Sequence, residues 1–288
     1  MRIRDLFGQA RPVFSFEFFP PKSEAGERSL LRTIDNLRPL APSFVSVTYC
    51  AGGTTREKTI EIVTRIKREH GIEAMAHLTC VGHSRDEIAA ILDRLAAAGL
   101  ENVLALRGDP PRGETAFVRP ANGFGYASEL VAFITERGYP FCLAGAGYPE
   151  GHPECRDLER DVQHLRLKVD AGVSVIITQL FYDNRAYFAF VERARRAGIT
   201  VPILPGIMPI TNVPQIERIT ALCGACIPAE LRARLHAAEA EEAKVLQVGI
   251  DHALAQCRDL LAGGAPGIHF YTLNQSPATA AILAELRR

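Results

Sequence analysis

One carboxylate stands apart among the residues whose types could do chemistry. Glu17 lies in the apolar run Val13 to Phe18, with Phe16 and Phe18 on either side of it in sequence. Apolar surroundings disfavour the charged form of a carboxylic acid and raise its pKa, which suits a general acid that works near neutral pH. A buried structural glutamate paired with an arginine from another strand fits the same pattern. The residues alone therefore leave a catalytic and a structural role open.

A second carboxylate lies in a stiff loop. Asp109 follows Gly108 and precedes Pro110 and Pro111, so the backbone around it has little freedom. Such a loop can hold a carboxylate in a fixed position at a ligand, and the ordinary alternative is a turn aspartate that binds its own backbone. His77 lies in another apolar run, where a lone histidine is more often buried with satisfied hydrogen bonds than a ligand.

Cysteine and histidine spacing gives no recognised metal or redox motif. His152 lies near Glu154 and Cys155, but this spacing fits no standard set of metal ligands. Cys223 and Cys226 form a CxxC without a second pair or a nearby histidine, at a helix end rather than after a first strand. We therefore expect reduced thiols and no metal.

The elements that must position these residues repeat one unit, in which a short apolar run rich in β-forming residues is followed by a longer amphipathic helix. The predicted strands are Val13 to Phe18, Phe44 to Thr48, Glu73 to His77, Asn102 to Leu106, Pro140 to Ala144, Val173 to Thr178, Pro202 to Gly206 and Gly267 to Tyr271. The predicted helices are Ser23 to Leu37, Thr55 to Glu69, Ser84 to Ala97, Ser128 to Glu136, Arg156 to Asp170, Arg185 to Arg196, Val213 to Leu222, Ala243 to Leu261 and Ala278 to Leu286.

This repeat favours a closed barrel. Parallel neighbours require crossover helices, and a count of eight units is typical of a barrel. An open doubly wound sheet would show a glycine fingerprint after its first strand, where this chain has Pro20 and Pro21. The segment from Gly224 to Glu242 is expected to be an elaboration after the seventh strand. The prediction is an α/β fold, a single (β/α)8 TIM barrel over residues 1–288.

Chemistry in such a barrel lies at the carboxyl ends of the strands, where the loops converge. Polar residues fall at or just after most of the predicted strand ends, so a polar mouth is expected. These residues are Glu17, Thr48, Tyr49, His77, Arg107, Asp109, Tyr148, His152, Gln179, Tyr271 and Asn274. No lysine falls at a strand end, which disfavours a Schiff-base aldolase, and no GxSxG nucleophile elbow is present.

Charge and hydropathy exclude several kinds of partner. Lys plus Arg equals Asp plus Glu at 33 each, so there is no basic excess for nucleic acid or an anionic membrane. No apolar run reaches the roughly 18 residues that a membrane helix needs, and the first residues lack the apolar core of a signal peptide. We expect a cytoplasmic protein without nucleic-acid or membrane partners.

Seven motifs occur along the chain in a fixed order. They are FEFFPP at 16–21, SVTY at 46–49, LRGDPP at 106–111, YPEGHPE at 148–154, ITQLFYD at 177–183, PGIMPI at 205–210 and HFYTLN at 269–274. Together they resemble the methylenetetrahydrofolate reductase family, from about residue 10 to the end of the chain. The resemblance implies a β/α barrel with non-covalent FAD that exchanges a hydride with a one-carbon folate. It also implies NADH or NADPH as electron donor and a homo-oligomer.

The resemblance gives roles to particular residues. It implies that Glu17 is the general acid that protonates the departing N10 of methylenetetrahydrofolate, and that Asp109 lies near the flavin and the pterin. It implies folate contacts from Gln179, Tyr271 and Gln275. The positions implied to contact FAD are Thr48, Tyr49, His77, Leu106, Arg107, Gly108, Asp109, Tyr126, Ala146, Tyr148, His152, Asp161, His164 and Lys168.

The chain also departs from the family pattern. Val213 stands where many members carry an aromatic residue that stacks on substrate, and Gln275 replaces a familiar arginine. Before Lys168, His164 and Leu167 replace the usual Asn and Arg, which removes donors from the expected FAD phosphate and adenosine region. Two other interpretations stay open. One is a pterin-binding methyl-transfer barrel without FAD, and the other is a partner-dependent subunit fed by another electron carrier.

Overall fold

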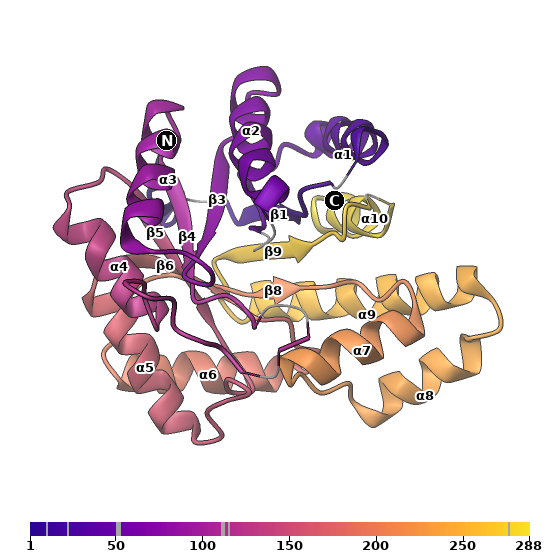
Figure 1. Cartoon of the computed structure of the whole chain (residues 1–288). Coiled ribbons are helices and arrows are strands. Elements are labelled where there is room, and N and C mark those ends of the chain that lie inside the picture. Colours follow the sequence, from indigo (N-terminus) through magenta and orange to yellow (C-terminus); the bar gives the residue numbers. More distant parts are fainter. Residues whose placement is uncertain (10, 22, 50–52, 111–112, 115, 276) are drawn as a thin grey trace.

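A ring of parallel strands forms the centre of the molecule, and helices cover its outside (Figure 1). The computed structural model describes residues 1–288 except 10, 22, 50–52, 111–112, 115 and 276, and of residues 53–57 only the backbone. The strands are β1 (Val13–Phe18), β2 (Phe44–Val47), β3 (Ala74–Thr79), β4 (Asn102–Leu106), β5 (Cys142–Gly147), β6 (Val173–Thr178), β7 (Ile203–Leu204), β8 (Gly206–Ile207) and β9 (Gly267–Tyr271).

Helices follow the strands in the predicted alternation. They are α1 (Glu24–Leu37), α2 (Gly53–Glu69), α3 (Arg85–Ala97), α4 (Ala127–Glu136), α5 (Leu158–Asp170), α6 (Asn184–Arg196), α7 (Val213–Cys223), α8 (Ala229–Ala238), α9 (Glu242–Ala262) and α10 (Pro277–Leu286). The expected elaboration after the seventh strand contains α8, which with α7 and α9 extends to one side of the barrel (Figure 1). Among the described residues, no helix is both long and apolar enough to cross a membrane.

The barrel closes through a strand that is broken at a proline. The sheet runs in the order β7-β6-β5-β4-β3-β2-β1-β9-β8, and only Pro205 separates its two ends in the chain. Proline has no N–H to donate, so the ladder is interrupted there. Its carbonyl still accepts from His269 N at 2.9 Å, and Gly206 N donates to Thr178 Oγ1 at 2.9 Å. β7 and β8 are thus two halves of the seventh strand, and the predicted TIM barrel is confirmed.

Most predicted strand bounds hold, and β5 is the main exception. Its prediction ended at Ala144, whereas the strand continues to Gly147. Glycines usually weaken a strand, but here they let helix α6 approach, because a Cβ on Gly147 would lie 2.7 Å from Phe190 Cζ. β3 likewise continues past His77 to Thr79.

Side chains of each strand alternate between the helix layer and the barrel interior. Phe14, Phe16 and Phe18 of β1 belong to the large cluster between strands and helices. Ser15 and Glu17 therefore face the interior. Below them the interior is filled by a second apolar cluster, closed at the bottom by Ile3 of a short 3-10 helix over Ile3–Leu6.

Candidate active site

A cavity of about 760 Å³ opens at the carboxyl ends of the strands. It collects most of the residues that the sequence placed at strand ends, as the barrel geometry predicts. The predicted site residues that line it are Glu17, Thr48, Tyr49, His77, Leu106, Arg107, Gly108, Asp109, Ala146, Tyr148, His152, Gln179 and Tyr271. A polar mouth is therefore present.

Glu17 lies on the cavity wall between two histidine rings. Its side chain is 9% exposed, and its Oε2 lies 3.4 Å from His77 Nε2 and 3.3 Å from His269 Nε2. The other ring nitrogen of His269 lies 2.8 Å from Ser15 Oγ. The backbone carbonyl of Glu17 accepts the Thr272 hydroxyl at 2.6 Å, which fixes the end of β1 to the end of β9. The carboxylate is thus hydrogen-bonded to His269 on one side and faces the His77 ring on the other, where Nε2 has no hydrogen-bond partner among the described residues.

The expected rise in the pKa of Glu17 is not what the structure gives. Burial does raise this pKa, but His77 and His269 lower it by more, so its net direction is below the ordinary value. The phenylalanines that suggested an apolar site face the opposite side of the strand. The expectation was wrong because neighbours in sequence along a strand are not neighbours in space. Burial lowers the pKa of His77 to about 4, so its ring is neutral at neutral pH.

Two buried hydroxyls face the cavity without a partner among the described residues. Thr48 Oγ1 and Thr79 Oγ1 are both shielded from solvent and make no hydrogen bond within that part of the chain. A buried polar group without a partner is unfavourable, which marks these hydroxyls as positions for a ligand's polar atoms. Thr79 was missed from the sequence. It could have been predicted from its position two residues after His77, which puts both side chains on the same face of β3.

The loop after β4 brings its backbone close to the cavity. Gly108 has φ +88°, and a Cβ there would lie 2.6 Å from Val81 Cγ1. Only glycine fits, so this turn depends on it. Asp109 follows at the cavity rim and is exposed. Pro111 lies outside the described residues.

Two of the three predicted folate contacts lie in the mouth. Gln179 lines the cavity, and its Oε1 accepts from Leu180 N at 2.9 Å. The Tyr271 hydroxyl donates to Thr178 O at 2.6 Å, so this residue offers the cavity its ring rather than its hydroxyl. Gln275 instead lines a separate cavity of about 300 Å³. Tyr271 lines both cavities, so the structure places Gln275 beside Tyr271 but apart from Gln179.

Two further residues do not lie where the sequence suggested. Asn274 bonds the backbone of Phe19 in both directions, at 2.8 and 2.9 Å, and so clamps a loop rather than lining the mouth. Val213 is buried in the cluster around α7 and α8. An aromatic face at the rim comes from Phe19, which lines the cavity and is 38% exposed.

A second, outer cavity of about 510 Å³ lies beside α5. It contains the remaining predicted FAD contacts, Tyr126, Asp161, His164 and Lys168. It shares residues with the mouth, so the two form one elongated cleft. The shared lining residues are Leu106, Arg107, Ala146, Tyr148 and His152.

Two cations lie where the cavities meet. Arg107 is paired with Glu154 through two hydrogen bonds of 2.6 Å each, and its guanidinium lies 4.8 Å from the centre of the Phe117 ring. Lys168 reaches from α5 to Ala146 O at the end of β5, and burial lowers the pKa of its ammonium to about 8. The cleft therefore offers positive charge in its middle, although both terminal nitrogens of Arg107 are already hydrogen-bonded to Glu154.

The closed barrel, its polar mouth and its long cleft define a class: an α/β-barrel enzyme that binds its ligands at the carboxyl ends of its strands. The family model of methylenetetrahydrofolate reductase matches residues 2–287. The chain belongs to the methylenetetrahydrofolate reductase family.

Individual relatives agree with this assignment. The chain is 38% identical over 268 residues to 5,10-methylenetetrahydrofolate reductase of Escherichia coli (strain K12), covering 93% of this chain and 88% of that one. It is 40% identical over 295 residues to methylenetetrahydrofolate reductase (NADH) 1 of Zea mays, covering 99% of this chain and 50% of that one. The chain thus spans about half the length of the plant relatives it matches.

Solved structures confirm the fold. An uncharacterized protein from Clostridium thermocellum, described as binding two copies of 5-methyl-5,6,7,8-tetrahydrofolic acid, aligns with a TM-score of 0.66 at 16% identity, covering 96% of this chain and 95% of that one. A dihydropteroate synthase from Xanthomonas albilineans aligns with a TM-score of 0.54 at 13% identity, covering 96% and 92%. At these identities the likeness concerns the fold alone.

Proposed function

We propose that this chain is a flavin-dependent 5,10-methylenetetrahydrofolate reductase, with FAD in the long cleft and the one-carbon folate at the mouth. The observation that carries the proposal is the position of Glu17, a buried carboxylate at a cavity wall between two histidine rings. Opening the five-membered ring of the folate requires a proton at N10, and we assign this step to Glu17, the buried carboxyl group of the mouth, rather than to the exposed Asp109 at its rim. Family membership specifies the reaction, and Glu17 gives the chain a group that can assist it.

The cleft fits FAD by shape and by donor chemistry. It is elongated, it has at one end hydroxyls without a partner among the described residues, and it has cations at its middle. Thr48, Thr79 and the turn at Gly108 would hold the flat ring, while Arg107 and Lys168 would hold the pyrophosphate. Bound FAD would supply the hydride transfer.

The ribose and adenine end would lie in the outer cavity. Asp161 can accept hydrogen bonds from ribose hydroxyls there, and His164 lies one helical turn further on. Tyr126, which is 63% exposed, offers a ring at the rim. Leu106, Ala146, Tyr148 and His152 would line the stretch between the two ends.

Glu17 Oε2 is the atom at which the proton would be held for folate N10. With the cavity open to water, His77 and His269 keep the pKa of this carboxyl below its ordinary value. A folate ring over the mouth excludes water, which disfavours the charged carboxylate and moves its pKa upward. His269 Nε2, at 3.3 Å, is placed to exchange the proton with it. The residue would therefore become an effective acid when the substrate covers it.

The remaining mouth residues would orient the folate. Gln179 has its Oε1 occupied by Leu180 N, which leaves its amide NH2 for a pterin acceptor. Asp109 stands at the rim, where its charge can orient the pterin. NADH is our first choice of electron donor, and it would use the same mouth before the folate does.

The test is an anaerobic visible spectrum of purified protein supplied with FAD, recorded before and after addition of NADH. A parallel sample receives methyltetrahydrofolate instead. We expect flavin absorption from protein-bound FAD, bleached in both samples. Bleaching by the folate alone would assign another electron carrier, which is the partner-dependent alternative. Failure to bind FAD at all would contradict the redox function and favour a methyl-transfer barrel.

A further inference from the structure

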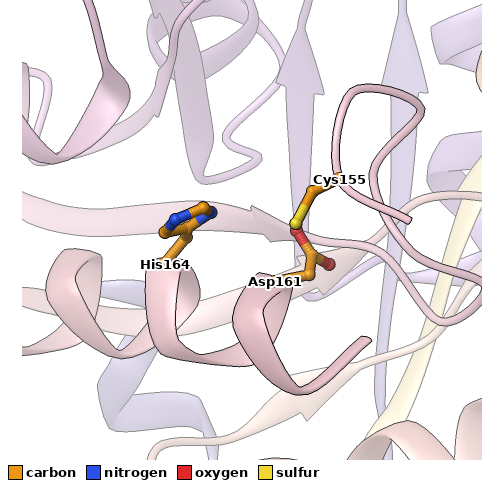
Figure 2. A group of neighbouring side chains, drawn as sticks. All are labelled: Cys155, Asp161 and His164. Atoms are coloured by element: carbon orange, nitrogen blue, oxygen red, sulfur yellow. The ribbon is translucent and has the colours of Figure 1, made fainter. Parts of the chain in front are cut away.

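Cys155, Asp161 and His164 form a cluster of three different metal-binding side chains in the outer cavity. Their ligand atoms, one from each residue, all lie within 4.8 Å of one another. Figure 2 shows the Cys155 thiol directed at the Asp161 carboxylate, with His164 on the same helix further along. The spacing in sequence gave no such indication, because Cys155 is separated from the other two by the start of α5.

The local structure explains why these side chains meet. Asp161 and His164 are three residues apart on α5, so they lie on one face of the helix. Cys155 lies in the preceding loop, where its N–H donates to His152 O at 2.8 Å and its thiol to Asp157 O at 3.4 Å. Asp157 is the N-cap of α5 and accepts from two backbone amides of the first turn. The loop is therefore fixed to the helix that carries the other two ligands.

We propose that these three residues bind a divalent ion of the zinc type. Thiolate, carboxylate and imidazole are the three ligand classes that Zn²⁺ takes, and three protein ligands leave a fourth, open position. Tetrahedral ligands at zinc distances lie about 3.3–3.8 Å apart, so side-chain rotation of the order of an ångström completes the geometry. Cys155 and Asp161 are half-buried and His164 is exposed, which gives the ion a path from solvent through the outer cavity.

The ion would have a consequence for the proposed flavin site. Asp161 and His164 line the part of the cleft that we assign to the ribose and adenine of FAD. One carboxylate and one imidazole cannot serve both ligands, so ion and FAD should exclude each other. This consequence rests on the proposed function, whereas the metal site itself does not.

The metal site is tested with Co²⁺, added to reduced, FAD-free protein and followed by absorption. We expect one ion per chain, a thiolate-to-cobalt charge-transfer band, the d–d bands of a four- or five-coordinate ion, and displacement of all these signals by Zn²⁺. C155S should remove the charge-transfer band. H164N should keep that band but weaken binding at least about tenfold.

The control is the C223S/C226S double variant, because among the described cysteines only Cys155 and this CxxC at the end of α7 are not buried. It should leave the spectrum and the affinity unchanged. A charge-transfer band that survives in C155S, or that disappears in C223S/C226S, would overturn the proposal. So would the absence of any such band in the unmodified protein.

Exclusion is tested by adding FAD to the Co²⁺-loaded protein. We expect the charge-transfer band to fall as protein-bound flavin rises. Flavin binding with the cobalt spectrum unchanged would overturn the exclusion. If metal-free protein binds no FAD, the proposed reductase function fails while the cobalt titration still decides the metal site.

Discussion

The two halves of the barrel interior differ in chemistry. Above the apolar residues Val13, Phe44 and Met75 near its base, the wall made by β9, β1, β2 and β3 carries polar side chains, whereas the wall made by β4 to β7 is mainly apolar. The polar wall has Ser15, Glu17, Ser46, His77, Thr79 and His269. The apolar wall has Leu104, Ala144, Val175, Ile177 and Leu204. For the proposed function, this difference means that one side of the mouth would supply proton chemistry, while the other side would supply shape and contact for a flat ligand.

The largest expected effect comes from the carboxylate of the polar wall. Glu17→Gln removes the acidic proton and keeps the size of the side chain. We expect folate turnover to fall by about 10²–10⁴, the usual contribution of a general acid. Reduction of bound FAD by NADH should stay near its original rate, because that half of the cycle needs no acid at this position. Stopped-flow spectra of the two half-reactions measure both.

The matched control for that variant is Glu101→Gln, an exposed carboxylate that Lys67 contacts at 3.0 Å, near the start of β4. It should leave both half-reactions unchanged. If Glu17→Gln slows both halves equally, Glu17 is structural and the contrast between the two walls has no catalytic meaning.

Next in size is an effect of pH on stability. The pKa of His77 falls from 6.5 in the unfolded chain to about 4 in the fold, because burial disfavours the charged ring. Between these values the unfolded chain binds more protons. The free energy of unfolding should therefore drop by roughly 3 kcal/mol as pH falls from 6.5 to 4. Glu17, whose pKa is lowered from 4.5, adds to this loss only at lower pH.

Urea unfolding of the FAD-free protein between pH 7 and pH 4 measures this effect. His77→Asn removes the titrating group and should flatten the curve. His236→Asn is the control, because that histidine is exposed and lies 3.1 Å from Glu239. An unchanged slope in His77→Asn would mean that the polar wall does not carry the acid sensitivity.

The prediction for Glu17 in β1 shows which features of the polar wall follow from the sequence and which do not. Strand bounds and the chemistry at strand ends follow from local patterns, so Glu17 and the mouth were identified. Its environment was not, because the residues around it come from β2, β3 and β9. His269 and Thr79 could have been found by counting back two from Tyr271 and on two from His77, since side chains two apart share a face.

No pattern in the sequence predicted the contacts between loops that lie far apart in the chain. Arg107 and Glu154 lie 47 residues apart, and only the closed barrel brings them together. Cys155 and the α5 residues Asp161 and His164 were likewise not predicted to meet, because their spacing in sequence matches no regular motif. Such pairs depend on how loops of different strands converge, which a period of two or 3.6 residues does not encode.

An intermediate effect is expected at the turn after β4, next to the apolar wall, where the proposed binding of FAD depends on the shape of the backbone. Gly108→Ala places a methyl group 2.6 Å from Val81 at φ +88°. We expect about 2–3 kcal/mol of lost stability from strain and overlap, and about tenfold weaker FAD binding.

Gly138→Ala is the control, with φ +70° and nothing within 4 Å of the new atom. It should lose about 1 kcal/mol and bind FAD normally, as read from thermal melts and flavin fluorescence. Equal effects in both variants would show that the Gly108 turn has no particular role at the ligand.

The smallest effect is expected where the two cavities meet. Glu154 occupies both arms of the Arg107 guanidinium at 2.6 Å, although its own side chain is 56% exposed. The proposed FAD pyrophosphate would need the same two arms, so FAD would have to displace this carboxylate. Glu154→Gln weakens the competing pair and should tighten FAD binding about two- to fivefold, which corresponds to an exposed ion pair of less than about 1 kcal/mol. Glu159→Gln, whose carboxylate lies 3.5 Å from Arg196, should leave it unchanged. Weaker FAD binding in Glu154→Gln, measured by fluorescence titration, would mean that Glu154 holds Arg107 in its binding position instead of competing for it.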